Sequence, residues 1–300
     1  MAVRRRVKMS ELLEYPHDPD QPIAMFDSGV GGLTVAAAVR RLLPNEDIVY
    51  LGDTARVPYG IKSPVTVTQF ATQLAGWLLQ HRPKLMVVAC NTLSAVAMPT
   101  LRSLGLPIIG VVEPGARAAA ALSGGRTVAV LATEATVNSG AYLQAIHAID
   151  DSVPVVQRSC PLFVPMAEEG RDSSDKLVNE AAYEYLEPIR RLRPGVVVLG
   201  CTHYPLLRDA IAQAVNSGAV VVDSAEETAW TVQRALKKSN LLSSRANTGT
   251  LRCYATDNPE RFRKIGTRFC GESLEHVELV PLDDIVQMDL QLAESGGFAG

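Results

Sequence analysis

Two cysteines occupy equivalent places in the sequence, each directly after a short apolar run. Cys90 follows residues 85–89, and Cys201 follows residues 196–200. One such cysteine is more often a small buried hydrophobic residue than a reactive group. Two of them, each followed by hydrogen-bonding side chains, favour a reaction at a carbon between two sulfurs. One thiolate would remove a proton from one face of that carbon, and the opposite thiol would return a proton to the other face.

The residues around each cysteine leave other chemistry open. A helix N-terminus and the nearby His203 would lower a thiol pKa and raise its reactivity. A cysteine with a histidine is also typical of nucleophilic hydrolases, which form a covalent acyl intermediate and need only one cysteine. The chain has no C-x-x-C motif and no paired-histidine spacing, so we expect no metal site. The remaining cysteines have no comparable setting and are expected to be structural: Cys160, Cys253 and Cys270.

A glycine-rich turn, Asp27-Ser28-Gly29-Val30-Gly31-Gly32, follows the first apolar run. Glycines there permit a tight turn and close approach of the backbone to a ligand, and the next helix N-terminus favours an anion. The turn lacks the dinucleotide fingerprint and the Lys-Ser/Thr ending of a phosphate loop. Asp27 would also repel a phosphate, so we expect this carboxylate to handle a proton or to bind an ammonium group.

Two further loops carry polar groups, and each also has a purely structural interpretation. Residues 52–60 offer amides, a hydroxyl and the phenol of Tyr59, or else form a surface loop held by an Asp53 side-chain cap. Residues 160–170 form a proline-containing loop that ends in Glu168 and Glu169. By pattern alone, these two carboxylates are typical of a solvated helix start.

The elements that must position these residues are short apolar runs without two-residue alternation. Strands of this kind are buried on both faces, as in a parallel sheet. Longer helical segments separate them, which predicts an α/β fold with ligand sites beyond the carboxyl ends of the strands. The predicted strands cover residues 23–26, 48–51, 85–89, 108–112, 127–131, 153–157, 196–199, 220–222, 251–255 and 277–280.

Local signals mark the starts of three helices. A serine cap and a proline at residues 63–64 predict a helix that runs to about residue 82, before Pro83. A serine at 173 or 174 can cap a second helix that runs towards residue 193. Asn258, followed by a proline, opens a third and amphipathic helix.

Composition excludes several classes of protein. Apolar residues make up 47% of the 300-residue chain and charged residues 20%, which is typical of a globular protein of one or two domains. The net charge is −3 with both signs well mixed, so we expect no nucleic-acid partner. No secretory signal or membrane span is evident, and five cysteines without close pairing predict free thiols in a reducing cytoplasm. Residues 1–21 are polar and aperiodic, and we expect a poorly ordered N-terminal extension there.

The motifs as an ordered set resemble those of the glutamate racemase family, whose members make D-glutamate for bacterial peptidoglycan. The matching segments cover residues 26–35, 52–60, 89–92, 133–142, 161–170 and 200–206, and the resemblance extends from about residue 23 to 282. Only the two cysteine motifs are fairly specific singly, whereas the ordered set is very specific. One departure is Ala132 before Thr133, where the family more often has a glycine.

The resemblance implies two similar α/β domains, each a mostly parallel sheet flanked by helices, with the active site in the interdomain cleft. The first domain would combine residues 22–112 with 224–300, and the second would be 113–223. It further implies racemisation of L-glutamate to D-glutamate without pyridoxal phosphate, metal or other cofactor, for cell-wall synthesis in the cytoplasm. Glutamate is then the expected partner, with no membrane involved. The sequence leaves the oligomeric state open, a homodimer being one option, and does not tell whether a cell-wall precursor regulates the enzyme.

The resemblance also implies roles for individual residues. Cys90 would act on D-glutamate with Asp27 beside it, and Cys201 on L-glutamate with His203 beside it. Glu168 would support His203, although Glu169 could be the aligned residue. The substrate's carboxylates and amine would be held by Asp27, Ser28, Pro58, Tyr59, Gly60, Asn91, Thr92, Thr133, Thr202 and His203.

Three rival functions remain at this point. An aspartate or hydantoin racemase of the same superfamily would share the cysteine pair. A Cys/His hydrolase would need one cysteine only. A non-catalytic binding protein on the same scaffold would lack site residues, yet none of the residues that can be matched is missing.

Overall fold

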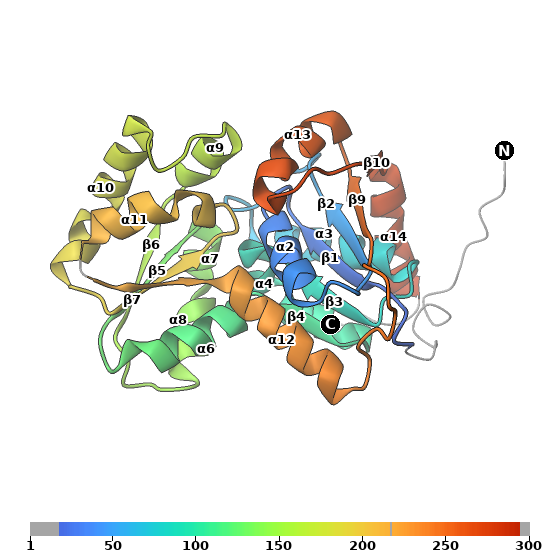
Figure 1. Ribbon diagram of the computed structural model, residues 1–300, viewed down its shortest axis with the longest axis horizontal. Helices are drawn as coiled ribbons and strands as arrows, with labels where there is room; N and C mark the ends of the chain where they lie inside the picture. Colours follow the sequence, from blue (N-terminus) through green and yellow to red (C-terminus); the bar gives the residue numbers. More distant parts are fainter. Residues whose placement is uncertain (1–17, 217, 295–300) are drawn as a thin grey trace.

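The computed structural model of the protein describes residues 18–216 and 218–294. Most of the predicted N-terminal extension, residues 1–21, therefore lies outside the described residues. Ten parallel strands form two sheets, with the orders β10-β9-β2-β1-β3-β4 and β6-β5-β7-β8 (Figure 1). All ten predicted strands are confirmed within a few residues. Their bounds are β1 (Ile23–Asp27), β2 (Ile48–Gly52), β3 (Leu85–Val88), β4 (Ile108–Gly110), β5 (Val128–Ala132), β6 (Val155–Ser159), β7 (Val196–Gly200), β8 (Val220–Asp223), β9 (Leu251–Ala255) and β10 (Val277–Leu279).

Helices cover both faces of each sheet, which confirms the predicted α/β class. Those around the first sheet are α2 (Leu33–Leu42), α3 (Pro64–Leu79), α4 (Asn91–Val96), α5 (Met98–Leu101), η1 (Arg102–Leu104), α12 (Ser224–Lys238), α13 (Pro259–Cys270) and α14 (Leu282–Glu294). Those around the second are α6 (Val112–Ser123), α7 (Glu134–Ser139), α8 (Ala141–His147), α9 (Phe163–Glu168), α10 (Lys176–Arg191), η2 (Tyr204–Leu207) and α11 (Arg208–Val215). Among the described residues, no helix is both long and apolar enough to cross a bilayer.

Burial on both faces explains why the strands lack alternation. In β1, Ile23 and Met25 pack with α2, α12 and α13, whereas Ala24 and Phe26 pack on the opposite side with α3 and α14. All five residues of β1 are buried. Burying one side chain the size of Phe26 contributes roughly 1.5–3 kcal/mol, so an apolar residue is favoured at every strand position.

Two predicted helix starts are confirmed and one is wrong. The Ser63 side chain accepts from the Thr66 amide at the start of α3, and Asn258 caps α13. α3 ends at Leu79, three residues before the predicted end. The cap of α10 is Asp175, not Ser173 or Ser174. The correction has a local reason, because the hydroxyl and amide of Ser174 both bind the Asp172 carboxylate, while the Ser173 hydroxyl accepts from Ala210 of α11.

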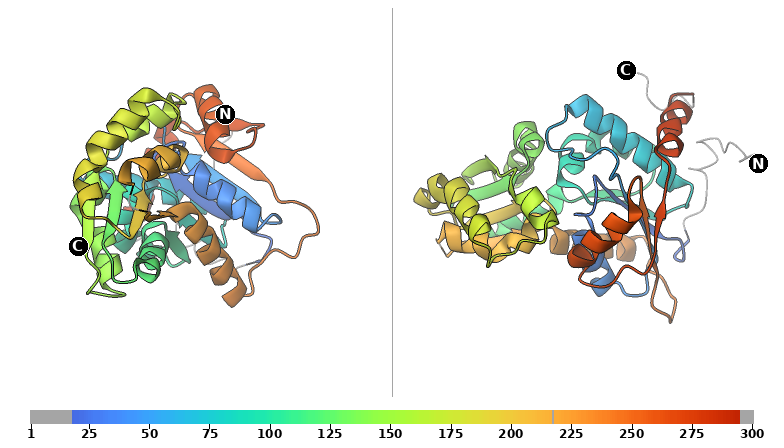
Figure 2. Two further views of the ribbon diagram at one scale, coloured as in Figure 1. Left: turned by 60° about the vertical axis from the view of Figure 1, so that its left-hand side comes forward. Right: turned by 90° about the horizontal axis from the view of Figure 1, so that it is seen from above.

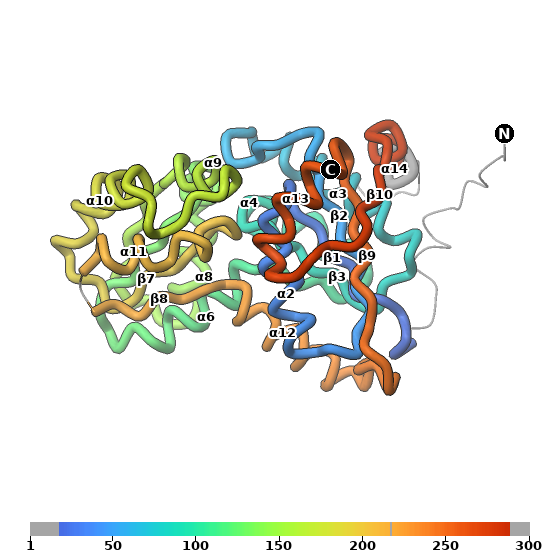
Figure 3. Tube along the Cα trace, turned by 45° about the horizontal axis from the view of Figure 1, so that its top comes forward, coloured from blue at the N-terminus to red at the C-terminus, as the bar shows by residue number. Residues whose placement is uncertain are grey.

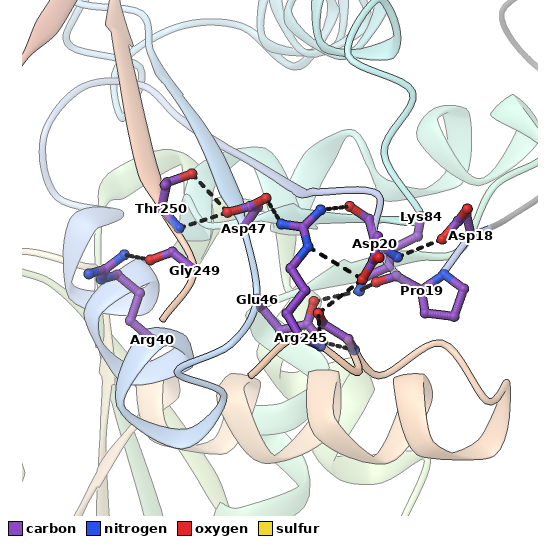
Figure 4. A network of polar contacts seen from close by, with 11 residues as sticks. Asp18, Pro19, Asp20, Arg40, Glu46, Asp47, Lys84, Arg245, Gly249 and Thr250 are labelled. Atoms are coloured by element: carbon purple, nitrogen blue, oxygen red, sulfur yellow. Dashed lines mark hydrogen bonds and ion pairs between the residues drawn. The ribbon is translucent and has the colours of Figure 1, made fainter. Parts of the chain in front are cut away.

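A polar network fixes the amino ends of the first sheet's strands (Figure 4). Lys84, just before β3, forms a buried ion pair with Glu46, just before β2, and donates to the carbonyl of Pro19. Arg245 pairs with Asp47 beside them. The reactive loops lie at the other, carboxyl ends of these strands, so this network supports the sheet without touching the site.

The carboxyl ends of the two sheets face one another (Figures 1 and 2). β1 lies between β2 and β3, so the loops after these three strands meet at one edge. In the second sheet β5 lies between β6 and β7, so the loops that follow them also meet. The chain crosses between the sheets at α6 and α12, which pack on each other. The tube in Figure 3 shows α9 and α13 near one another where the two halves meet.

Candidate active site

A cavity of about 390 Å³ lies between the two halves, and both cysteines line it. Every residue predicted for the site lines this cavity except Asp27. The lining residues are Ser28, Gly29, Val57, Pro58, Tyr59, Gly60, Ile61, Cys90, Asn91, Thr92, Thr133, Glu134, Pro161, Val164, Pro165, Glu168, Cys201, Thr202 and His203. The structure therefore brings together residues that are more than a hundred positions apart in the chain.

Cys90 is held at the N-terminal end of α4, two residues beyond Val88 at the end of β3. Its thiol donates to the Ser28 hydroxyl, with 3.6 Å between Sγ and Oγ. Burial raises the pKa of the Cys90 thiol, and the negative charge of Asp27 raises it further, although the Leu93 amide opposes this. The neutral thiol is therefore the favoured form of Cys90.

Asp27, the last residue of β1, lies beneath the glycine-rich turn. Its Oδ2 accepts the amides of Gly29 and Gly32 at 3.1 and 3.0 Å. Its Oδ1 is buried and has no hydrogen-bond partner among the described residues. A Cβ added to Gly32 would lie 2.7 Å from the Asp27 Cβ, so only glycine lets the turn wrap this closely. The turn thus directs two of its amides to a carboxylate of the protein, which argues against a phosphate loop.

Cys201 has a different set of neighbours. Its Sγ lies 3.9 Å from Nδ1 of His203, and Nε2 of His203 lies 3.1 Å from Oε1 of Glu168. Burial lowers the pKa of His203, but the hydrogen bonds to Cys201 and Glu168 outweigh it and raise the pKa above its usual range. The hydrogen bond from His203 holds the pKa of Glu168 below its ordinary value. Glu169 points elsewhere and pairs with Arg171 at 2.9 Å.

Two glycines let the halves approach closely. A Cβ on Gly31 would lie 2.2 Å from the Thr202 hydroxyl and 2.7 Å from the His203 ring. A Cβ on Gly60 would lie 2.9 Å from Cβ of Thr133, and the Gly60 carbonyl accepts the Ala135 amide at 2.9 Å. Loops of the first sheet therefore contact the second sheet's loops directly at the cavity.

Polar groups on the floor of the cavity can bind an anionic ligand. Asn91 Oδ1 accepts from the Tyr142 hydroxyl at 2.7 Å. The Asn91 Nδ2 is buried without a hydrogen-bond partner in the part of the chain that the structure describes. The hydroxyls of Thr92 and Thr133 lie 2.9 Å apart. An unpaired amide donor beside two hydroxyls suits a carboxylate.

Asp53 decides against one of the two interpretations that the sequence left open for residues 52–60, the surface loop held by its side chain. It is fully buried and does not cap a surface loop. Its carboxylate accepts from Arg56 Nε at 2.6 Å, from the Thr256 hydroxyl at 2.8 Å and from the Tyr59 hydroxyl. Tyr59 therefore lines the cavity with its phenol committed to Asp53. Since Thr256 is far away in the sequence, no local pattern marks this arrangement.

The structure also bears on the remaining chemistry. The five cysteines, including Cys160, Cys253 and Cys270, are buried free thiols. Within residues 18–216 and 218–294, no group of three or more histidine, cysteine, aspartate or glutamate side chains is arranged to hold a metal ion. The reactive groups at the cavity are thus two thiols with separate partners, a carboxylate for Cys90 and an imidazole for Cys201.

Comparisons with known proteins show which family the chain resembles. Residues 33–232 match the Asp/Glu/hydantoin racemase family. A glutamate racemase from Geobacter metallireducens is 46% identical over 266 residues, which cover 88% of this chain and 98% of the relative. The crystal structure of a Francisella tularensis glutamate racemase in complex with D-glutamate has a TM-score of 0.83 and 37% identity, covering 88% of this chain and 99% of that one. A Thermus thermophilus glutamate racemase in complex with β-chloro-D-alanine has a TM-score of 0.81 and 45% identity, covering 89% and 99%.

Proposed function

The chain belongs to the Asp/Glu/hydantoin racemase family and is an amino-acid racemase, and we propose that it interconverts L- and D-glutamate without a cofactor. Cys90 and Cys201 would serve as acid and base on opposite faces of the α-carbon. The observation that carries this proposal is that both thiols line one cavity, each with its own charged partner.

In the direction from L- to D-glutamate, the Cys201 thiolate removes the α-proton. The C–H bond breaks, an S–H bond forms, and the electron pair stays on the α-carbon and its carboxylate. The Cys90 thiol then gives its proton to the opposite face, so its S–H bond breaks and a new C–H bond forms. The reverse direction exchanges the two roles. After each turnover, the cysteine that began as the thiolate is protonated and the other is the thiolate.

The proton states of the free protein support a start from L-glutamate. Burial and the Asp27 charge favour the neutral Cys90 thiol, which is the acid in that direction. The raised pKa of His203 favours an imidazolium beside Cys201, and a cation there stabilises a thiolate, which is the base. Asp27 and His203 would reset the two thiols between turnovers as general acid–base partners.

The α-proton of an amino acid is much less acidic than a thiol, so the site must stabilise the carbanion and exclude water. We assign the α-carboxylate to the donors of the second half and of α4, chiefly Asn91 Nδ2 and the hydroxyls of Thr92 and Thr133. The unpaired Oδ1 of Asp27 is the acceptor available to an ammonium group or to Cys90. Tyr59 would contribute its backbone and ring, since its hydroxyl is bound to Asp53.

The remaining substrate contacts are assigned to Ser28, Pro58, Gly60, Thr202 and His203, all on the cavity wall. Of the two candidate carboxylates, we assign the support of His203 to Glu168, because it makes the hydrogen bond and Glu169 does not.

The division into one domain of residues 22–112 plus 224–300 and a second of residues 113–223 is proposed as well, because β5 to β8 all fall in the second segment. D-Glutamate made in the cytoplasm would then supply peptidoglycan synthesis.

A decisive test follows the circular dichroism of L-glutamate with purified protein, a chelator present and pyridoxal phosphate absent. We expect the signal to decay to zero with the wild type, and Cys90→Ser and Cys201→Ser each to lose most of the activity. Near-normal turnover by either variant would contradict the two-cysteine mechanism. A flat wild-type signal with reduced thiols would favour an aspartate or hydantoin racemase, to be tested with those substrates. A covalent acyl adduct on one cysteine would instead favour a hydrolase.

A further inference from the structure

Glu168 stands where three hollows of the molecule meet. It lines the reaction cavity, a groove of about 700 Å³ along α13, and a smaller cavity of about 190 Å³ beside Gly29. Arg261 lines the second and third hollows but not the reaction cavity. The Glu168 carboxylate and the Arg261 guanidinium therefore form part of the wall that separates the reaction cavity from the groove.

The two carboxylate oxygens of Glu168 face different groups. Oε1 accepts from Nε2 of His203 at 3.1 Å, and Oε2 lies 3.8 Å from Nη2 of Arg261. Glu168 ends α9, which packs on η2 and α10 of the second half, whereas Arg261 is in α13, which packs on α2, β9 and β10 of the first. Figures 1 and 3 both show α9 and α13 side by side. The ion pair therefore bridges the two halves of the protein.

The other charges nearby have partners of their own or lie farther away. Arg263 pairs with Glu260 at 3.1 Å within α13, and Glu169 pairs with Arg171. Lys264 and Arg268 line the groove, but neither forms an ion pair with Glu168. Among the described residues, Arg261 is the one cation of α13 within 4 Å of the Glu168 carboxylate.

His203, the group that Glu168 supports, is enclosed on its other sides. It faces Cys201, Glu168, the charge of Asp27 and the ring of Phe269, whose centroid lies 5.0 Å away. A change in the charge around Glu168 therefore reaches His203 through a single hydrogen bond.

We propose that Arg261 is a positioning residue for the racemisation, an inference that rests on the proposed function. By pairing with Glu168 across the two halves, Arg261 holds this carboxylate anionic and directed at His203. The acid–base pair at Cys201 is thus completed by a residue of the first half, so it depends on how the two halves are placed.

The test reverses the charge at Arg261 and compares it with a matched control. Arg261→Glu and Arg263→Glu change the net charge equally and lie on the same helix, while Arg261→Lys preserves the cation. An ion pair as exposed as this one changes an equilibrium by up to about fivefold, and charge reversal adds repulsion to the loss. We expect kcat/KM to fall about tenfold in Arg261→Glu at low salt. In Arg261→Lys and Arg263→Glu it should stay within twofold of the wild-type value. The deficit should shrink in 0.5 M salt, which screens a partly exposed pair.

A second readout does not depend on turnover. The His203 ring can be titrated by NMR. Arg261→Glu should lower the pKa of His203, because repulsion turns the Glu168 carboxylate away from the imidazolium that it stabilises, while Arg263→Glu should leave that pKa unchanged. Equal losses in the two charge reversals, or a His203 pKa that stays unchanged or rises in Arg261→Glu, would overturn the role of Arg261. A wild type that does not racemise glutamate would overturn the proposed function, whereas the titration would still decide whether Arg261 acts on His203.

Discussion

Tyr59→Phe should destabilise the protein without weakening glutamate binding. The Tyr59 side chain is 2% exposed, its ring packs on Phe70 with centroids 5.3 Å apart, and its hydroxyl donates to Asp53. Burial, followed by the Asp53 charge, raises the pKa of Tyr59, so the phenol stays a hydrogen-bond donor at any working pH. Phenylalanine keeps the ring and removes only this bond.

The magnitude follows from what Asp53 retains. A hydrogen bond to a charged group contributes about 1.5–3 kcal/mol. In the variant, Asp53 still accepts from Arg56 at 2.6 Å and from Thr256 at 2.8 Å, so its charge stays compensated. We therefore expect a loss of about 1.5–2 kcal/mol, which lowers Tm by roughly 3–8 °C. KM for glutamate should stay within about twofold, because the lost donor does not reach the substrate.

Thermal denaturation and steady-state kinetics below the variant's Tm separate the two effects. Asp53→Ala is the contrasting variant, because it strands the Arg56 guanidinium, whose side chain is 10% exposed. Breaking a buried pair by removing one partner costs about 3–5 kcal/mol. If Tyr59→Phe raised KM tenfold while Tm stayed unchanged, the phenol would be a substrate ligand and the assignment to Asp53 would be wrong.

Three further predictions test other parts of the molecule. Gly31→Ala should lower kcat/KM by about 100-fold with little effect on refolding, because the new methyl group would displace the His203 ring. A kcat/KM near that of the wild type would refute the close approach of Gly31 to His203. Lys84→Met should cost about 3–5 kcal/mol in denaturant unfolding, and adding Glu46→Gln should recover part of that loss if the buried charge is its cause. The Tm difference between the wild type and Glu168→Gln should be largest near pH 6. This Tm difference should narrow as pH falls below about 4.5 and the Glu168 carboxyl becomes protonated, because its pKa in the folded protein is lowered. It should also narrow as pH rises through the raised pKa of His203, where the imidazolium is lost. A Tm difference that does not depend on pH would contradict the pairing of Glu168 with His203.

The central strands could be predicted because burial on both faces leaves a signal in every residue. The central strands β1, β3, β5 and β7 appear in the sequence as almost wholly apolar runs, whereas the edge strands β6 and β10 carry polar residues and are partly exposed. The helix caps at Ser63 and Asn258 are also local signals. The cap of α10 could not be predicted in the same way. Ser174 is an equally good cap by type, and only its bonds to Asp172 leave Asp175 to cap the helix.

The residues of the candidate site were likewise predictable only where a local sequence pattern marks them. The two cysteines could be found from their places after β3 and β7, since parallel strands end at one edge. The choice between Glu168 and Glu169 depends on the direction of two adjacent side chains at the end of α9, which the sequence does not determine. The Asp53 cluster depends on Thr256, which β9 delivers beside β2. Such contacts follow from strand order, which the sequence left open.

The unequal surroundings of the two thiols are consistent with a reaction between equal partners. Cys90 lies near a buried carboxylate and Cys201 beside an imidazole, so the two cysteines have different partners although their sequence settings match. Because two enantiomers have the same free energy in water, kcat/KM must be equal in both directions at every pH, whatever the pKa of each thiol. The asymmetry can therefore appear only as compensating differences in kcat and KM. A change at the Cys201 side, such as Glu168→Gln, must lower kcat/KM equally for L- and D-glutamate, and its effect on the two kcat values reveals which thiol the change has reached.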